Sequence, residues 1–245
     1  MSVEPELISI DDSFMFSCNS GLDCFNMCCK DVNQFLYPYD IIRLKTNLNL
    51  GSEEFLDTYT IIYAGGTTGL PVVSFKTHPA NGHTCPFVGE NGCRVYPDRP
   101  SSCRIFPLAR AISRSRETGE IKEHFALIKD PICKGFQENS TMTVRQFSSD
   151  QDLAVYNENN DTMIELISLK QQIMPGPLDP ASKEKFVLAC YNIDRFRSAI
   201  FNDQLIEKHQ INPELYERIK TDDVALLGLG FSWIKSELFG GKPSF

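Results

Sequence analysis

The spacing of apolar residues predicts a mixed N-terminal part of short helices and strands. Apolar residues recur at helical spacing over 41–50, and this pattern stops at Gly51. Ser52, which two glutamates follow, is expected to cap a second helix that runs toward Tyr63. The apolar run at 72–75 then predicts a strand, because β-branched and aromatic residues favour extended backbone.

Two further segments predict an antiparallel hairpin, and the pattern after them is helical. Strands are expected at 104–113 and 121–128, joined by a turn at 117–120. From Thr143 onward glycine is rare, and helices are expected at 144–152, 153–173, 180–200, 212–220 and 222–238.

The predicted fold class is therefore α+β. A cysteine-rich part with a small antiparallel sheet and metal-binding loops spans 1–140, and a mainly helical part spans 141–245. The boundary is soft, because no linker separates the parts, and one compact domain fits the pattern equally well.

Charge is unevenly distributed in this chain of net charge -8. Residues 1–60 contain ten acidic and three basic residues, whereas 61–140 contain seven acidic and ten basic ones. An acidic protein whose arginines cluster between 94 and 116 is poorly suited to binding nucleic acid in general, but these arginines could hold an anionic group.

Neither a membrane span nor a secretory leader is expected. The longest apolar run, 224–234, has 11 residues and is too short to cross a bilayer. The N-terminal stretch is acidic and lacks the basic start of a signal peptide. We therefore expect a cytoplasmic protein with no membrane partner, in a compartment where disulfides are uncommon.

The cysteines are concentrated in the first part of the chain. Eight of the nine lie in the first 133 residues, at Cys18, Cys24, Cys28, Cys29, Cys85, Cys93, Cys103 and Cys133. The ninth, Cys190, lies in an apolar helical stretch and is expected to be a core residue.

Metal binding explains this cysteine pattern better than a disulfide framework does. An odd count would leave one thiol over, and thiolates on loops can converge on a metal. Eight thiolates suit two four-thiolate sites, or one site with additional supporting cysteines. Adjacent side chains on an extended backbone point apart, so Cys28 and Cys29 are expected to serve different metals or opposite sides of one cluster. His83, two residues before Cys85, is not included, because a loop histidine is more often simply exposed.

The segment 93–107 carries a specific motif. It reads Cys-Arg-Val-Tyr, then Arg-Pro, then Cys-Arg-Ile-Phe-Pro. Together with Cys24 to Cys29 and Cys85-Pro86-Phe87, it resembles the CxxCxxCC or YkgJ-like cysteine-cluster family. Members of that family are described as zinc- or iron-chelating or iron–sulfur proteins, and the same domain type occurs in flagellin lysine methylases.

The resemblance covers about residues 16–135 and implies that the eight cysteines are metal ligands, with Cys133 at the position of a late family cysteine. The first spacings depart from the family pattern, since five and three residues replace two short gaps of two. Cys18 is therefore either displaced or part of a second site.

The expected cofactor is an iron–sulfur cluster, [4Fe–4S] in form, with zinc as the alternative. Nearby arginines would offset the negative charge of a four-thiolate cluster, and Arg94 and Arg104 are the candidates for that role. The favoured function is electron transfer, or metal-dependent modification of a protein or small-molecule partner. The alternative is a zinc-stapled module that binds a protein and catalyses nothing. Signatures of serine hydrolases, phosphate-binding loops and zinc proteases are absent from the sequence, so whether the protein is an enzyme stays open.

Overall fold

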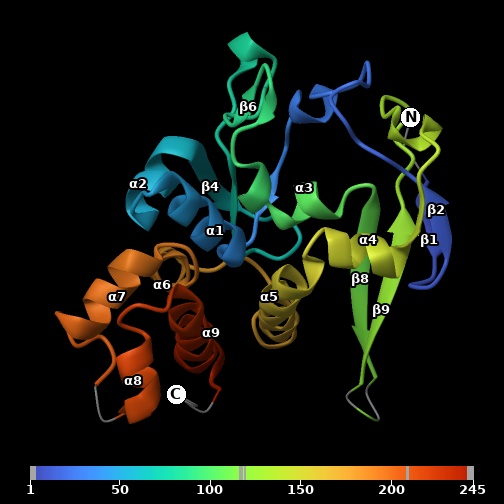
Figure 1. Cartoon of the computed structure of the whole chain (residues 1–245). Coiled ribbons are helices and arrows are strands. Elements are labelled where there is room, and N and C mark those ends of the chain that lie inside the picture. The colour runs from blue at the N-terminus through green and yellow to red at the C-terminus, as the bar shows by residue number, and fades with distance from the viewer. Residues whose placement is uncertain (1–3, 116–117, 119, 208–209, 242–245) are drawn as a thin grey trace. The chain divides into compact units, whose positions relative to one another are not determined.

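A computed structural model describes residues 4–115, 118, 120–207 and 210–241, and it confirms the α+β class (Figure 1). The chain forms two compact units. Unit 1 comprises Met1–Val32 and Thr77–Asn157, and unit 2 comprises Asn33–Lys76 and Glu158–Phe245. The expected boundary near residue 140 thus falls inside unit 1, and 33–76 groups with the C-terminal helices instead of with the cysteines.

Unit 1 is built from short antiparallel sheets with small helices around them. One sheet has the strand order β1-β9-β8, and the pairs β10-β2 and β6-β7 form two more. The strands are β1 Glu6–Ile8, β2 Ser13–Met15, β6 Val88–Gly89, β7 Gly92–Cys93, β8 Leu108–Arg114, β9 Ile121–Leu127 and β10 Thr141–Thr143. The helices are α3 Ser101–Ile105, α4 Val144–Asp150 and the start of α5 Leu153–Ile173.

The expected hairpin is present as β8 and β9, which pair from Leu108↔Leu127 to Arg114↔Ile121. The strand expected to start at 104 begins only at Leu108, because α3 occupies the residues before it. Part of the expected turn, residues 117 and 119, lies outside the described residues.

An aromatic cluster forms the core of unit 1. Phe14 and Phe16 follow the strand alternation of β2 and lie 5.6 and 6.3 Å, between ring centroids, from Phe147 of α4. Phe16 also contacts Phe106 and Phe136, with centroids 6.0 and 5.3 Å apart. Since Phe16 lies just before the first cysteine, this cluster anchors the base of the cysteine loops.

Unit 2 combines a three-stranded antiparallel sheet, of order β3-β5-β4, with helices. The strands are β3 Phe35–Leu36, β4 Thr60–Ala64 and β5 Pro71–Phe75. The helices are α1 Pro38–Leu48, α2 Ser52–Tyr59, the rest of α5, α6 Pro180–Cys190, α7 Ile193–Phe201, α8 Pro213–Arg218 and α9 Asp223–Phe239. None of the helices in the described ranges is long and apolar enough to cross a membrane.

Two expectations for unit 2 are wrong. The helix expected to run toward Tyr63 ends at Tyr59, because the β-branched residues that follow pair with β5 as β4. The helix expected over 180–200 is split near Asn192, whose side-chain oxygen accepts a 2.8 Å hydrogen bond from the Ser52 hydroxyl. Ser52 N–H also donates to Asp194 Oδ2 at 2.7 Å, so the first residue of α2 holds the first turn of α7 although the two are far apart in the sequence.

Candidate metal centre

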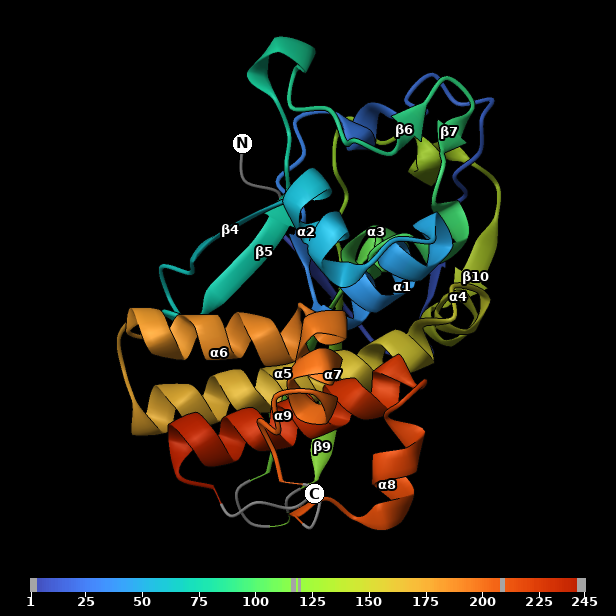
Figure 2. The same cartoon turned by 90° about the vertical axis from the view of Figure 1, so that its left-hand side faces the viewer.

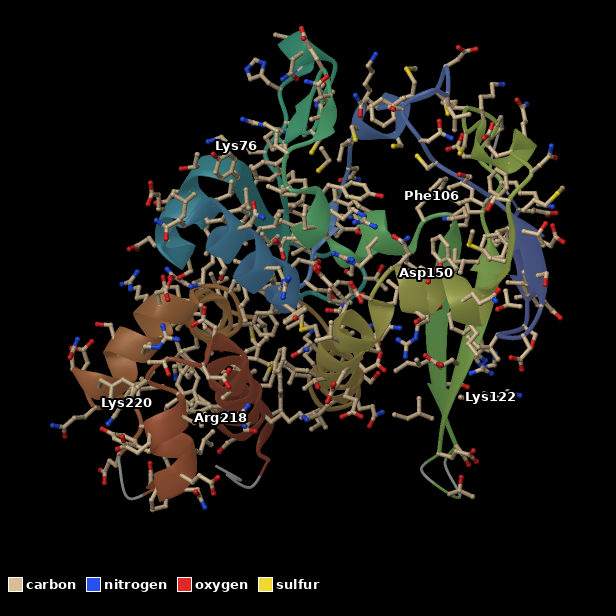
Figure 3. The ribbon with its side chains drawn as sticks, in the orientation of Figure 1. Lys76, Phe106, Lys122, Asp150, Arg218 and Lys220 are labelled. Atoms are coloured by element: carbon tan, nitrogen blue, oxygen red, sulfur yellow. The ribbon has the colours of Figure 1, made fainter. Side chains whose placement is uncertain are left out.

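All eight candidate cysteines lie in unit 1, on four short segments. Cys18, Cys24, Cys28 and Cys29 belong to the loop 16–32, which we call the N-terminal loop, and the last two end a 3₁₀ turn, Met27–Cys29. Cys85 precedes β6, Cys93 ends β7, Cys103 lies in α3 and Cys133 follows β9. Figure 3 shows sulfur atoms gathered at the end of unit 1 opposite the end of the β8–β9 hairpin where Lys122 is labelled.

The cysteines are thiols in the described part of the chain, which includes all nine. Cys190 is 2% exposed in α6 of unit 2, which confirms it as a core residue.

Backbone hydrogen bonds attach the N-terminal loop to its two neighbouring segments. Cys85 N–H donates to Cys29 O at 2.8 Å, and Asp31 N–H donates to Gly82 O at 3.1 Å. On the other flank, Ser17 N–H donates to Gly135 O at 3.0 Å. The loop is therefore held between the segment that contains Cys85 and the segment that contains Cys133.

Gly135 is required by the close approach on that second flank. A Cβ at this position would lie 2.7 Å from Phe16 Cε2 and 2.9 Å from Ser17 O. Only glycine lets the segment after Cys133 approach the N-terminal loop this closely.

Electrostatic interactions link four thiols, which we call the first thiol group: Cys18, Cys24, Cys28 and Cys133. Burial raises the pKa of Cys18, and the charges of Cys28, Cys133 and Cys24 raise it further. Lys134 N–H donates to Cys24 Sγ at 3.2 Å, which places Cys24 beside the Cys133 segment.

The other four thiols form the second thiol group: Cys29, Cys85, Cys93 and Cys103. Electrostatic interactions connect Cys29 with two of them, Cys85 and Cys103. Burial raises the pKa of Cys85, and the charges of Cys93 and Cys28 add to that effect. The hydrogen bond to Cys28 and burial raise the pKa of Cys29, and the charges of Cys85 and Cys103 contribute as well. Cys28 lies close to both groups.

The vicinal pair departs from the sequence-based expectation. Cys28 and Cys29 do not point apart on an extended backbone, since they lie in a 3₁₀ turn and their thiols hydrogen-bond to each other. The bond from Cys29 lowers the pKa of Cys28 to about 7, and the same bond raises the pKa of Cys29. The pair is therefore where the two thiol groups meet.

Three of the thiols share a local turn geometry. The backbone N–H two residues after the cysteine hydrogen-bonds the sulfur in Cys85-Pro86-Phe87, Cys93-Arg94-Val95 and Cys133-Lys134-Gly135. Burial raises the pKa of these thiols, and the N–H bonds oppose that effect. Such bonds stabilise thiolates and are among the contacts that tune a thiolate-bound metal.

The donor chemistry fits a soft metal centre, although the thiols gather without converging. Among the described residues, no group of three or more Cys, His, Asp or Glu side chains is arranged closely enough to hold a metal ion as it stands. Cys18, Cys28 and Cys103 are exposed, so ligands can be reached from solvent. Zinc and iron–sulfur centres both use thiolates that come from separate segments of the chain.

The arginines near the thiols differ in what they contact. Arg94 donates from Nη2 to Pro86 O at 2.6 Å, and its charge lowers the pKa of Cys93. Arg104 is 4% exposed and donates to Gln151 O at 2.8 Å, to Pro97 O and to Tyr156 Oη at 3.3 Å. The contacts of Arg104 are those of a structural anchor, and its role in balancing cofactor charge stays a prediction.

Arg99, which the candidate set omitted, lies among the thiols. Its guanidinium is stacked 4.0 Å from the Tyr96 ring centroid and donates to Tyr96 O at 2.7 Å. Burial raises the pKa of Cys18 and of Cys93, which belong to different thiol groups, and the positive charge of Arg99 opposes that rise at both. The sequence signal was its place in the motif between Cys93 and Cys103, but the direction of the side chain depends on its contact with Gln151 of a distant segment.

The histidines nearest the thiols have other partners. His83 Nδ1 lies 3.1 Å from the Thr77 hydroxyl, and His78 Nδ1 accepts a 3.2 Å hydrogen bond from Ala80 N–H. These contacts support leaving both histidines out of the ligand set.

Comparison with known proteins supports metal binding by this part of the chain. The sequence model of the CxxCxxCC family, described as "Putative zinc- or iron-chelating domain", matches residues 17–147. The match spans all eight candidate cysteines and more than half of the chain. No curated protein and no solved structure shows significant similarity to the chain.

Proposed function

The chain belongs to the CxxCxxCC family, and from that premise we propose that its eight N-terminal cysteines hold two iron–sulfur clusters that transfer electrons. The observation that carries the proposal is the location of all eight thiols in unit 1, where the positive charge of Arg99 acts on thiols of both groups.

Zinc ions and iron–sulfur clusters arrange their thiolate ligands differently. A zinc ion requires four sulfurs about 2.3 Å from one centre. A cluster binds each thiolate at a different iron, so its ligands lie farther apart and can come from loops that face each other without touching. Thiols on several separate segments of unit 1 are compatible with either centre, and we choose clusters because arginines beside the thiols would offset the negative charge of a four-thiolate cluster.

The two thiol groups are the proposed ligand sets. Lys134 N–H bonded to Cys24 Sγ supports a set on the Cys133 side. Cys85 N–H bonded to Cys29 O supports a set on the hairpin side. Because Cys28 and Cys29 are adjacent, the two sets would be joined through one turn of backbone, which suits electron exchange between them.

When bound, such clusters supply one-electron transfer. The residues of unit 1 would hold the thiolates in place and set the charge around them. The guanidinium of Arg99 lies close to a thiol of each set and would stabilise the added negative charge on reduction. The N–H groups of Phe87, Val95 and Gly135 would do the same for individual sulfurs.

Metal analysis of single-cysteine variants tests this assignment. We expect anaerobically purified Cys133→Ser and Cys93→Ser each to lose about half of the iron and sulfide of the wild-type chain, because each would empty one set. Cys190→Ala is the matched control and should retain full metal content, since its thiol is buried in unit 2. Unchanged metal content in Cys93→Ser or Cys133→Ser would remove that cysteine from the ligands.

A further inference from the structure

The outer strand of the unit 2 sheet lacks the features that usually protect a sheet edge. β4 pairs with β5 alone among the described strands, and Figure 2 shows it at the border of the sheet above α6. Its sequence, Thr60-Ile61-Ile62-Tyr63-Ala64, contains no charge and no proline. Ile61, Ile62 and Tyr63 are 47, 43 and 40% exposed. Natural edge strands are usually blunted by lysine, proline or a bulge, or covered by another element.

The register identifies which backbone groups face outward. Lys76 N–H donates to Tyr59 O, and Gly65 N–H donates to Leu70 O. Antiparallel ladders alternate, so the odd-numbered residues of β4 bond to β5 and the even-numbered ones face away from it. Ile62 and Ala64 thus offer both N–H and C=O at the free edge. Thr60 offers only its C=O, because its N–H bonds to Leu56 O at the end of α2.

We propose that two copies of the chain associate through β4, antiparallel and two-fold symmetric about Ile62. The two Ile62 residues would exchange a pair of hydrogen bonds, and each Ala64 N–H would donate to Thr60 O of the other copy. This pairing satisfies every outward backbone donor of β4 at Ile62 and Ala64. It is self-complementary, as an isologous interface requires, because the outward residues are spaced symmetrically about the central one.

A hollow beside β4 supplies area that the strand alone would lack. It has a volume of about 800 Å³ and is lined by Ile62 and Ala64 of β4, Val187 and Leu188 of α6, and Trp233 of α9. The two-fold axis of the proposed pairing is perpendicular to the joined sheet, so equivalent faces of the two sheets lie on the same side of it. The two α6 helices would therefore approach each other on that side. The half-exposed Val187 and Leu188 would then be covered together with Ile62.

Charges around the hollow favour a second copy over a partner of one sign. Lys185 is paired with Glu237, and Arg195 lies 3.7 Å from Glu53. Glu184 and Lys183 add one charge of each sign to the rim. The rim therefore does not repel a second copy electrostatically, and it offers little electrostatic attraction to a strongly acidic or strongly basic peptide.

Molar mass and hydrogen exchange of the full chain test the proposal. Light scattering after size exclusion should give twice the 27.7 kDa of one chain at high concentration and a falling average on dilution. Exchange of the Ile62 and Ala64 amides should slow as the concentration rises. The Ile61 and Tyr63 amides, already bonded to β5, should not change.

Substitution at the two-fold axis separates this edge from other apolar surfaces. Ile62→Lys places two like charges opposite each other and should raise the dissociation constant at least about tenfold. Phe35→Lys is the matched control, because Phe35 is 49% exposed on β3 at the other edge of the same sheet, and it should leave the mass unchanged. A monomer at every concentration, or a dimer in which the Ile62 and Ala64 amides exchange at the monomer rate, would overturn the proposal.

Discussion

Arg104 offers a quantitative test of how unit 1 is held together beneath the cysteines. Arg104 is 4% exposed, and its guanidinium donates to two backbone carbonyls, Pro97 O and Gln151 O, and to the Tyr156 hydroxyl. Its carbon Cζ also lies 4.5 Å from the Tyr156 ring centroid. These contacts tie the turn before Cys103 to α4 and α5.

Replacing Arg104 with methionine removes the donors and keeps most of the apolar stem. A hydrogen bond to a charged group contributes about 1.5–3 kcal/mol to the free energy of unfolding, and each buried acceptor left without a donor adds a desolvation penalty. Part of this loss is offset, because the buried Nε has no partner among the described residues and its desolvation penalty disappears. We expect a net loss of about 3 kcal/mol, which would lower Tm by roughly 6–12 °C.

Thermal unfolding followed by circular dichroism measures this effect, with Arg145→Met as the matched control. Arg145 pairs with Asp11 at the surface of the same unit, and both side chains are well exposed, so its loss should cost about 1 kcal/mol or less. The anchor role of Arg104 would be refuted if both variants unfolded at the same temperature.

Three further substitutions test other parts of the structure. Burial raises the pKa of Asp194, but the Ser52 N–H and Lys45 outweigh it and hold that pKa below its ordinary value. The carboxylate therefore stabilises the fold at neutral pH, and this contribution is lost as pH falls below the ordinary aspartate range. In denaturation measured across pH, the free energy of unfolding of Asp194→Asn should be about 2 kcal/mol below that of wild type at pH 7 and should converge with it in acid. Gly135→Val should lower both Tm and metal content, because its side chain would collide with the N-terminal loop, and an unchanged metal content would contradict the packing described for that loop. Lys170 is fully buried and donates to two backbone carbonyls, so Lys170→Met should cost about 2 kcal/mol in urea unfolding, and a neutral result would be inconsistent with those bonds.

Periodicity predicted the elements whose form is decided locally. The alternation of β8 and β9 and the long helices α5 and α9 follow from side-chain spacing alone. Side-chain spacing misplaced the ends of elements where contacts with residues distant in the sequence determine them. Asn192 lies at the start of α7, just after the end of α6, and its side chain accepts a hydrogen bond from Ser52, which lies 140 residues earlier.

The candidate site shows the same contrast between features that are decided locally and features that depend on distant contacts. The concentration of eight cysteines in the first 133 residues and the motif at 93–107 predicted a metal site in this part of the chain, and the family match supports metal binding there. Which thiols meet could not be predicted, since this depends on how Gly135 and Cys85 dock against the N-terminal loop. The sequence could not rank Arg99 above Arg94 and Arg104 for a related reason, because its side chain is oriented by Gln151 in a separate segment.

The most direct test of the central claim is the metal content of the wild-type chain after anaerobic purification. We predict iron and acid-labile sulfide in nearly equal amounts, with broad visible absorption that bleaches on chemical reduction. A colourless protein that contains stoichiometric zinc and no sulfide would contradict the iron–sulfur assignment.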